Sequence, residues 1–218
     1  MIFALWTGVS RVAGLVREIV AAAIFGHRGV MGAFTVAFAV PNLLRSLVAD
    51  SALTAAFIPV LTELRESGRQ REGDRLIGAL VSLIALALGA LTILAIIVAP
   101  WVMPLFAPSL PDQYVDDLVF LSQLMFPIVV LLALTGVAMA LLQMAGQFGP
   151  TAFAPVLWNA LIILSLVAIT PFFSGDDRII AYAIGILIGT LGQLLFLVPW
   201  LARLNQLRPR LGLRSPHL

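Results

Sequence analysis

The sequence predicts an all-α, polytopic membrane protein built as a bundle of six transmembrane helices. The 218 residues are 61% hydrophobic and only 11% charged, and the mean hydropathy is +1.07. Soluble domains of this length are far less apolar. The apolar runs are also long enough to meet the requirement of ~20 residues for crossing a hydrocarbon layer of ~30 Å.

The first three predicted spans cover about residues 2–25, 31–61 and 76–105. The first span has no basic segment before it and carries charges at its centre, so we expect no cleavable signal peptide. The second contains Pro41, which removes a backbone hydrogen bond and predicts a kink. A charged linker, "ELRESGRQREGDR", separates the second span from the third.

The last three predicted spans cover about residues 115–145, 151–173 and 179–204, and short turns such as "AGQFGP" and "SGDD" connect them. Connections this short favour antiparallel neighbours in a bundle. The spacing of Gly185, Gly189 and Gly192 places small residues on one face of the sixth helix, which favours close helix packing. We therefore interpret residues 1–205 as one transmembrane lobe. Residues 206–218 are interpreted as a cytoplasmic tail.

Basic and acidic residues occupy different connections. Arginines fill the linker after the second span and the tail after the sixth (Arg65, Arg69, Arg71, Arg75, Arg203, Arg208, Arg210 and Arg214), whereas aspartates dominate the loops after the third and fifth (Asp112, Asp116, Asp117, Asp176 and Asp177). By the positive-inside rule, we expect both arginine-rich segments and both termini in the cytoplasm.

Several classes of function are disfavoured by composition. The chain has no cysteine and only two histidines, so we expect no metal site and no cofactor. The basic residues cluster at membrane edges and are not interleaved with aromatic residues, which argues against a nucleic-acid partner. No nucleophile is paired with a general base, so an enzyme is not expected.

Three arginines nevertheless lie within the first two predicted spans. Arg11 and Arg17 are ~15 Å and ~24 Å along the first helix at 1.5 Å per residue, and Arg45 lies within "PNLLRSLVAD" of the second. An arginine facing lipid at the bilayer centre costs roughly 2.5–3.5 kcal/mol. We therefore expect these side chains to face a protein interior or a wet cavity.

Helical geometry groups the polar residues of the first span into two neighbouring faces. Residues seven apart lie within ~20° of one another around a helix, so Arg11 shares a face with Glu18, and Ser10 shares a face with Arg17. Gly14, between Arg11 and Glu18, leaves room for close approach of another backbone.

The second span contributes Asn42 and Arg45, which are neighbours three residues apart, and Asp50. Three arginines against Glu18 and Asp50 leave one excess positive charge, which favours a cradle for an anion such as a phosphate. Two alternatives stay open: the five charges could form structural ion pairs, or Arg11 could reach the cytoplasmic surface.

The stretches "SRVAGLVREIVAAAIFG" and "FTVAFAVPNLLRSLVADSALTAAFIPVLTE" resemble the first two helices of the MurJ/MviN lipid II flippases, within the MOP transporter superfamily. A later stretch, "FPIVVLLALTGVAMALLQMAGQFGPTAFAPVLWNALII", is similar to that family's fourth and fifth helices. The resemblance runs through most of the chain and is most specific in the first two helices.

This resemblance implies a function and a site. The family moves lipid II, an undecaprenyl-pyrophosphate-linked disaccharide-pentapeptide, across the bacterial inner membrane by alternating access through a cationic central cavity. It implies that Ser10, Arg11 and Arg17 line the cavity from the first helix, and Asn42 and Arg45 from the second. The family has fourteen helices, arranged as two six-helix lobes and two terminal helices. The chain is similar to the N-terminal lobe, and the resemblance implies that residues 206–218 could also be the start of a linker between lobes. A C-terminal lobe or second chain is then an expected partner, alongside lipid II and membrane lipids.

The sequence departs from the family at three places in the second helix. Gly32 stands where the family usually has an acidic residue, Ser46 replaces a second arginine, and Asp50-Ser51 replaces "EG". Two alternatives therefore stay open: a non-transporting scaffold for cell-wall synthesis, and a different MOP exporter of polyprenyl-linked polysaccharide units.

Overall fold

The fold is described from a computed structural model of the chain, which describes residues 2–26, 29–45 and 57–203. This part is helical and contains no strand, which confirms the all-α prediction. Its α-helices are α1 (Ile2–Phe25), α2 (Val30–Arg45), α3 (Ile58–Glu66), α4 (Gln70–Val102), α5 (Val115–Met125), α6 (Ile128–Met144), α7 (Phe148–Ile169) and α8 (Arg178–Arg203). Short 3-10 turns extend several of them: η3 (Met103–Phe106), η4 (Asp112–Tyr114), η5 (Thr170–Phe172) and η6 (Gly175–Asp177).

Four helical segments of the described residues are long and apolar enough to cross a membrane: Gln70–Phe106, Asp112–Met144, Phe148–Phe172 and Gly175–Arg203. Helix α1 has 24 residues and so reaches about 36 Å, but it carries three charged side chains. Helix α2 is a shorter apolar helix that continues through Pro41 to Arg45. Because residues 46–56, with Asp50, lie outside the described residues, the count of six spans stays a prediction.

The charged linker after the second predicted span is largely helical. Helix α4 begins at Gln70 rather than near Leu76, and α3 precedes it. Glu, Arg, Gln and Leu are all good helix formers, and Arg69 pairs with Glu72 one turn further on. Gly68 has φ +74°, and the Arg69 amide donates to the Leu64 carbonyl across this turn at 2.9 Å. The segment is thus two helices joined by a glycine turn.

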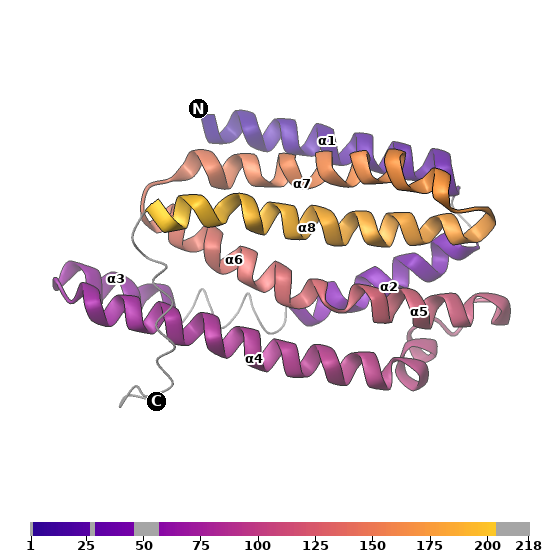
Figure 1. Cartoon of the computed structure of the whole chain (residues 1–218), viewed down its shortest axis with the longest axis horizontal. Helices are drawn as coiled ribbons and strands as arrows, with labels where there is room; N and C mark the ends of the chain where they lie inside the picture. The colour runs from indigo at the N-terminus through magenta and orange to yellow at the C-terminus, as the bar shows by residue number, and fades with distance from the viewer. Residues whose placement is uncertain (1, 27–28, 46–56, 204–218) are drawn as a thin grey trace.

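The predicted span 115–145 is divided at Phe126 and Pro127 into α5 and α6. Proline has no N–H to donate to the carbonyl four residues before it. The Val129 amide instead donates to the Phe126 carbonyl at 3.1 Å, a tighter turn than the α-helix makes. The two helices continue one another across this break (Figure 1).

Helices α1, α7 and α8 run alongside one another, and α6 connects this group to α4 at the other edge of the bundle (Figure 1). Helix α2 packs mainly against α5. Two apolar clusters fill the interior, one between α2, α5 and α8 around Phe34, Leu118 and Tyr182, the other between α4, α6 and α8 around Ile77, Leu142 and Leu197. Most of the surface of α4 is exposed and apolar, as expected for a helix that faces lipid.

Helices α7 and α8 pack closely against each other at three glycines of α8. A Cβ at Gly189 would lie 2.8 Å from Ile162 Cγ1, and a Cβ at Gly192 would lie 2.4 Å from Leu161 Cδ1. Gly185 likewise faces Ser165. The prediction that these glycines form a packing face is therefore confirmed.

The two ends of the bundle differ in charge: one mixes arginines with Glu63, Glu66, Glu72 and Asp74, and at the other aspartates predominate. The first residues of α1, the α3–α4 turn and the last residues of α8 lie at one end, and the connections before α5 and α8 lie at the other (Figure 1). The first end carries Arg69, Arg71, Arg75 and Arg203, and the second carries Asp112, Asp116, Asp117, Asp176 and Asp177. The loops at the acidic end are close enough for Asp117 to interact electrostatically with Asp176 and Asp177.

Candidate functional site

One face of α1 packs along α7. The side chains on this face recur at three- and four-residue intervals, which is the spacing of a single helical stripe. Trp6 meets Phe153 edge to face, with 5.0 Å between ring centroids. One turn later, Asn159 Nδ2 donates to the Ser10 carbonyl at 3.5 Å and to its own helix at Pro155 at 3.0 Å.

Gly14 and Arg17 continue the stripe. A Cβ at Gly14 would lie 3.8 Å from Asn159 Oδ1, an ordinary contact distance, so α1 lies beside the buried amide at this point. Arg17 follows, and its Cζ lies 4.9 Å from the centroid of the Trp158 ring. The spacing prediction that Ser10 and Arg17 share a face thus describes the side of α1 that contacts α7.

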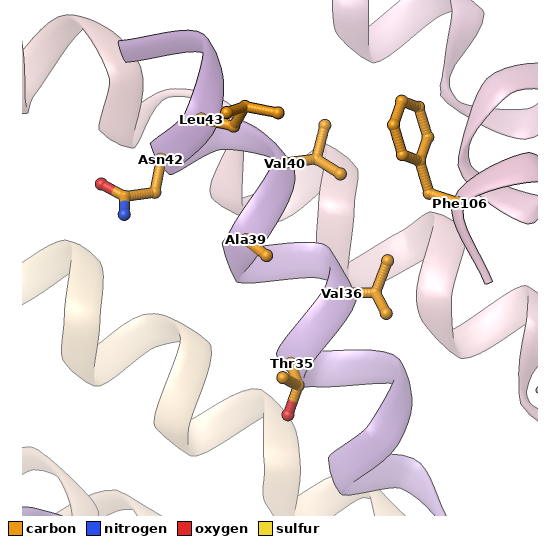
Figure 2. A pocket seen from close by; sticks show the side chains of 7 residues that line it. All are labelled: Thr35, Val36, Ala39, Val40, Asn42, Leu43 and Phe106. Atoms are coloured by element: carbon orange, nitrogen blue, oxygen red, sulfur yellow. The ribbon is translucent and has the colours of Figure 1, made fainter. Parts of the chain in front are cut away.

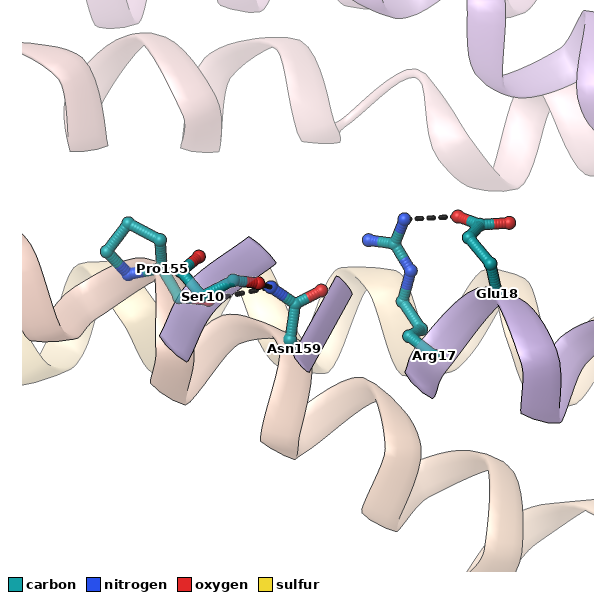
Figure 3. Close-up of polar contacts among 5 residues, drawn as sticks. All are labelled: Ser10, Arg17, Glu18, Pro155 and Asn159. Atoms are coloured by element: carbon teal, nitrogen blue, oxygen red, sulfur yellow. Dashed lines mark hydrogen bonds and ion pairs between the residues drawn. The ribbon is translucent and has the colours of Figure 1, made fainter. Parts of the chain in front are cut away.

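Arg17 is the most enclosed charged side chain of α1 for which exposure is described. Its side chain is 16% exposed, whereas that of Glu18 is 56% exposed. The Arg17 guanidinium donates to Glu18 Oε1, as drawn in Figure 3. Tyr182 of α8 also interacts electrostatically with both members of this pair.

Trp158 is itself fixed by α8. Its indole Nε1 donates to Thr190 Oγ1 at 3.0 Å, and the Thr190 hydroxyl donates to the Ile186 carbonyl at 2.8 Å. Arg17 therefore contacts a ring that two helices hold in place.

Two buried polar atoms on the α1–α7 face have no hydrogen-bond partner among the described residues. They are Arg17 Nε, a donor, and Asn159 Oδ1, an acceptor. An unpaired buried polar atom costs about 1–3 kcal/mol. One donor and one acceptor on this face could therefore still form hydrogen bonds with a further polar group. Asn159 as a whole is only 4% exposed.

Arg11 and Glu18 occupy the neighbouring, exposed face of α1. Within the described residues Arg11 makes no ion pair. The structure therefore does not join all the predicted residues of α1 into one cluster. Arg17 is largely enclosed between helices, whereas Arg11 lies on the exposed face of α1.

Asn42 lies near the end of α2 and lines an open groove of about 500 Å³. The rest of the groove is mostly apolar and is formed by α2 and η3 (Thr35, Val36, Ala39, Val40, Leu43 and Phe106). In Figure 2, Val36 and Val40 lie on the side of α2 toward Phe106, and Asn42 projects from the opposite side. Arg45 is the last residue of α2; its side chain, like Asp50 and Ser46, lies outside the described part of the chain.

A family model described as lipid II flippase MurJ matches residues 21–218. The chain belongs to the MurJ family of lipid II flippases. It is a multi-pass membrane protein of a transporter family, and within the described residues no three His, Asp or Glu side chains converge as a metal site would require.

MurJ relatives match nearly the whole of this chain. It is 34% identical over 218 residues to the lipid II flippase MurJ of Burkholderia cenocepacia, covering 97% of this chain and 42% of that protein. It is 35% identical to a probable lipid II flippase MurJ of Bdellovibrio bacteriovorus, covering 94% and 39%. A solved structure of a lipid II flippase MurJ in an inward closed conformation superposes with a TM-score of 0.74 at 26% identity, covering 92% of this chain and 42% of that one. The chain thus spans about 40% of the length of these relatives.

The MurJ resemblance pointed to the polar residues of the first two helices and to nothing on α7 or α8. No spacing rule in the sequence connects Trp158 or Tyr182 to the arginines of the first two helices. Both contact Arg17 only because α7 and α8 lie beside α1 in the fold. Asn159 likewise reaches the first helix only through the fold, by its hydrogen bond to the Ser10 carbonyl.

Proposed function

We propose that this chain is the N-terminal lobe of a lipid II flippase, which carries the undecaprenyl-pyrophosphate-linked headgroup across the bacterial inner membrane by alternating access. The observation that supports the proposal most strongly is the state of Arg17. Its guanidinium is mostly enclosed within apolar helices, its Nε–H has no described partner, and only one carboxylate pairs with it. Planar N–H donors in a setting of low polarity bind pyrophosphate oxygens well.

In this proposal the remaining polar residues have supporting roles. Arg11 and Arg45 add positive charge along the path of the headgroup, while Ser10 and Asn42 offer neutral polar groups. Glu18 and Asp50 keep the arginines apart and oriented. Transport breaks no covalent bond, so no residue is assigned a catalytic role.

We further infer that residues 1–205 contribute six spans and that both termini face the cytoplasm. The arginine-rich end of the bundle supports this orientation, because basic residues are retained on the cytoplasmic side. Because the chain spans about 40% of its relatives' length, the complete transporter requires a C-terminal lobe, on the same or a second chain. Two lobes that rock about a central site would expose it to each side in turn.

A non-transporting scaffold is the second candidate, and Gly32 is the observation that favours it. Where the family usually has an acid in the second helix, this chain has no side chain at all. A scaffold would keep the fold and membrane insertion but would not need charged groups along a transport path.

Complementation distinguishes the two. The chain is expressed alone, and together with a C-terminal lobe from a MurJ relative, in cells depleted of their own flippase, and lipid II in the outer leaflet is measured. We expect rescue only with the added lobe, and loss of rescue in Arg17→Ala. Arg203→Ala is the matched control, since Arg203 Cζ also lies over a tryptophan ring, Trp200, at 5.1 Å from its centroid, but Arg203 is the last residue of α8, at the end of the bundle where α1 begins (Figure 1).

Rescue that persists in both variants would remove Arg17 from the transport path and leave the scaffold as the better description. Absence of rescue with both lobes stably inserted would contradict transport by this chain.

A further inference from the structure

We propose that Trp158 is a positioning residue for Arg17: its indole face stabilises the guanidinium while leaving the N–H edge directed at the anionic headgroup. The inference rests on the proposed function in one respect, namely that Arg17 contacts pyrophosphate. The positioning itself rests on contacts among described residues of α1, α7 and α8.

The argument begins with the shape of the guanidinium. Its five N–H donors all lie in one plane and point outward from its edge. A carboxylate partner binds at that edge and accepts hydrogen bonds from some of these N–H groups, which are then not available to another anion. An aromatic ring contacts the face of the plane and consumes none, yet it attracts the cation through its quadrupole. Arg17 Cζ lies over the Trp158 ring, 4.9 Å from its centroid, so the ring stabilises the cation without adding a negative charge that would compete with an anion.

The single carboxylate beside Arg17 fits the same requirement. Glu18 takes one edge position and is more than half exposed, so it remains accessible to other groups. A second carboxylate in place of Trp158 would neutralise the site and repel pyrophosphate. An aromatic ring provides stabilisation and keeps the net charge positive.

The indole must be held still to act in this way, and α8 holds it. Thr190 accepts the indole N–H at 3.0 Å. Gly189, next to it, lets α8 approach the ring: a Cβ there would lie 3.3 Å from Trp158 Cδ1 and 3.1 Å from the Trp158 carbonyl. The orientation of Arg17 is thus determined by a helix that Arg17 is not part of.

The first experiment tests the contact without any ligand. The full chain, which has four tryptophans, is prepared in nanodiscs with Trp6, Trp101 and Trp200 changed to Phe, so that all tryptophan fluorescence comes from Trp158. We expect Arg17→Leu to change its emission maximum and intensity, and Thr190→Val to change them as well. Emission that is identical in all three proteins would overturn the positioning role.

The second experiment connects the contact to binding. Tryptophan analogues of nearly unchanged shape, with one to four ring fluorines, are inserted at position 158, and binding of undecaprenyl pyrophosphate is measured in nanodiscs. Fluorine withdraws density from the ring face, so we expect affinity to fall stepwise, by roughly 5- to 30-fold in total. The same series at Trp101, which is 70% exposed on α4, should leave affinity unchanged.

The outcomes separate this inference from the proposed function. If Arg17→Ala abolishes binding but fluorination at position 158 has no effect, the positioning role is wrong and the flippase proposal stands. If the fluorescence contact is present but neither Arg17→Ala nor fluorination alters binding, then Arg17 does not bind pyrophosphate and the proposed function fails at this residue. Equal losses at positions 158 and 101 would also overturn the positioning role.

Discussion

Arg17 is a charged side chain within an apolar helix, where burial costs free energy, and two neighbours offset that cost. Burying an arginine at the bilayer centre costs roughly 2.5–3.5 kcal/mol. The Glu18 carboxylate and the Trp158 ring both act on the same guanidinium. A stacked cation contributes about 2 kcal/mol when desolvated, so the aromatic contact alone offsets much of the penalty.

Gly32 offers a test of the departure from the MurJ pattern. A Cβ at this position would lie 3.7 Å from Leu110 Cδ1, an ordinary contact, and Gly32 is in the first turn of α2. An acid there interacts favourably with the helix dipole, by about 0.3–1 kcal/mol. We therefore expect Gly32→Asp to keep or raise the melting temperature of the chain in detergent.

Gly29→Asp is the matched control in the same turn. Gly29 has φ +70°, and its Cβ would lie 2.8 Å from Tyr114 Oη. We expect this variant to lose about 1–3 kcal/mol of stability. Equal melting temperatures for the two variants would contradict the packing described for this turn.

At this scale the sequence predicted which side chains are unusual but not what they contact. The cost of Arg17 in lipid and its shared face with Ser10 both follow from helix geometry. The contact with Trp158 does not, because the two residues are far apart in the chain and meet only through helix packing.

At the scale of elements, the contact between α7 and α8 depends on glycines, which have no side chain, on the face of α8 that meets α7. A methyl group at Gly189 would collide with Ile162 and with the Trp158 backbone. Overpacking of this kind costs roughly 1–3 kcal/mol. We expect Gly189→Ala to lower the melting temperature and to weaken rescue in the complementation assay, because it displaces Trp158.

Gly136→Ala in α6 is the matched control. Nothing lies within 4 Å of a Cβ built at Gly136, and alanine is favoured over glycine in a helix by about 1 kcal/mol. Gly136→Ala should therefore be neutral or stabilising. A loss of stability as large as that of Gly189→Ala would show that glycine flexibility, and not close packing, matters in these helices.

Element boundaries were predictable where apolar runs meet turn residues, and less so elsewhere. The glycine face of α8 follows from spacing alone. The charged linker was expected to connect two spans, but its composition also favours helix, and α3 and α4 extend into it. The break at Pro127 lies inside an uninterrupted apolar run, where hydropathy carries no information about backbone hydrogen bonds.

At the scale of the whole molecule, charge divides the bundle into an arginine-rich end and an aspartate-rich end. The chain has no cysteine, so single cysteines report the side of each end directly. Ser67, in the α3–α4 turn, and Ser174, before α8, are both exposed. We expect a membrane-impermeant thiol reagent added outside intact spheroplasts to label Ser174→Cys and not Ser67→Cys.

Lysed membranes are the control, since both variants should then be labelled. Labelling of Ser67→Cys in intact spheroplasts would reverse the proposed orientation. The two loops lie at opposite ends of the bundle (Figure 1), so labelling of both from outside would contradict the spans that separate them.

The packing of α1 against α7 also has a consequence for synthesis. Helix α7 begins about 120 residues after α1 ends, and a ribosome adding ~5–20 residues per second needs roughly 6–25 s to reach it. During that interval Trp158 does not yet exist, and α1 must enter the membrane without it. Glu18, made immediately after Arg17, is the partner available from the first moment. We therefore expect the adjacent Glu18 carboxylate to pair with Arg17 while α1 inserts into the membrane, before Trp158 has been synthesised.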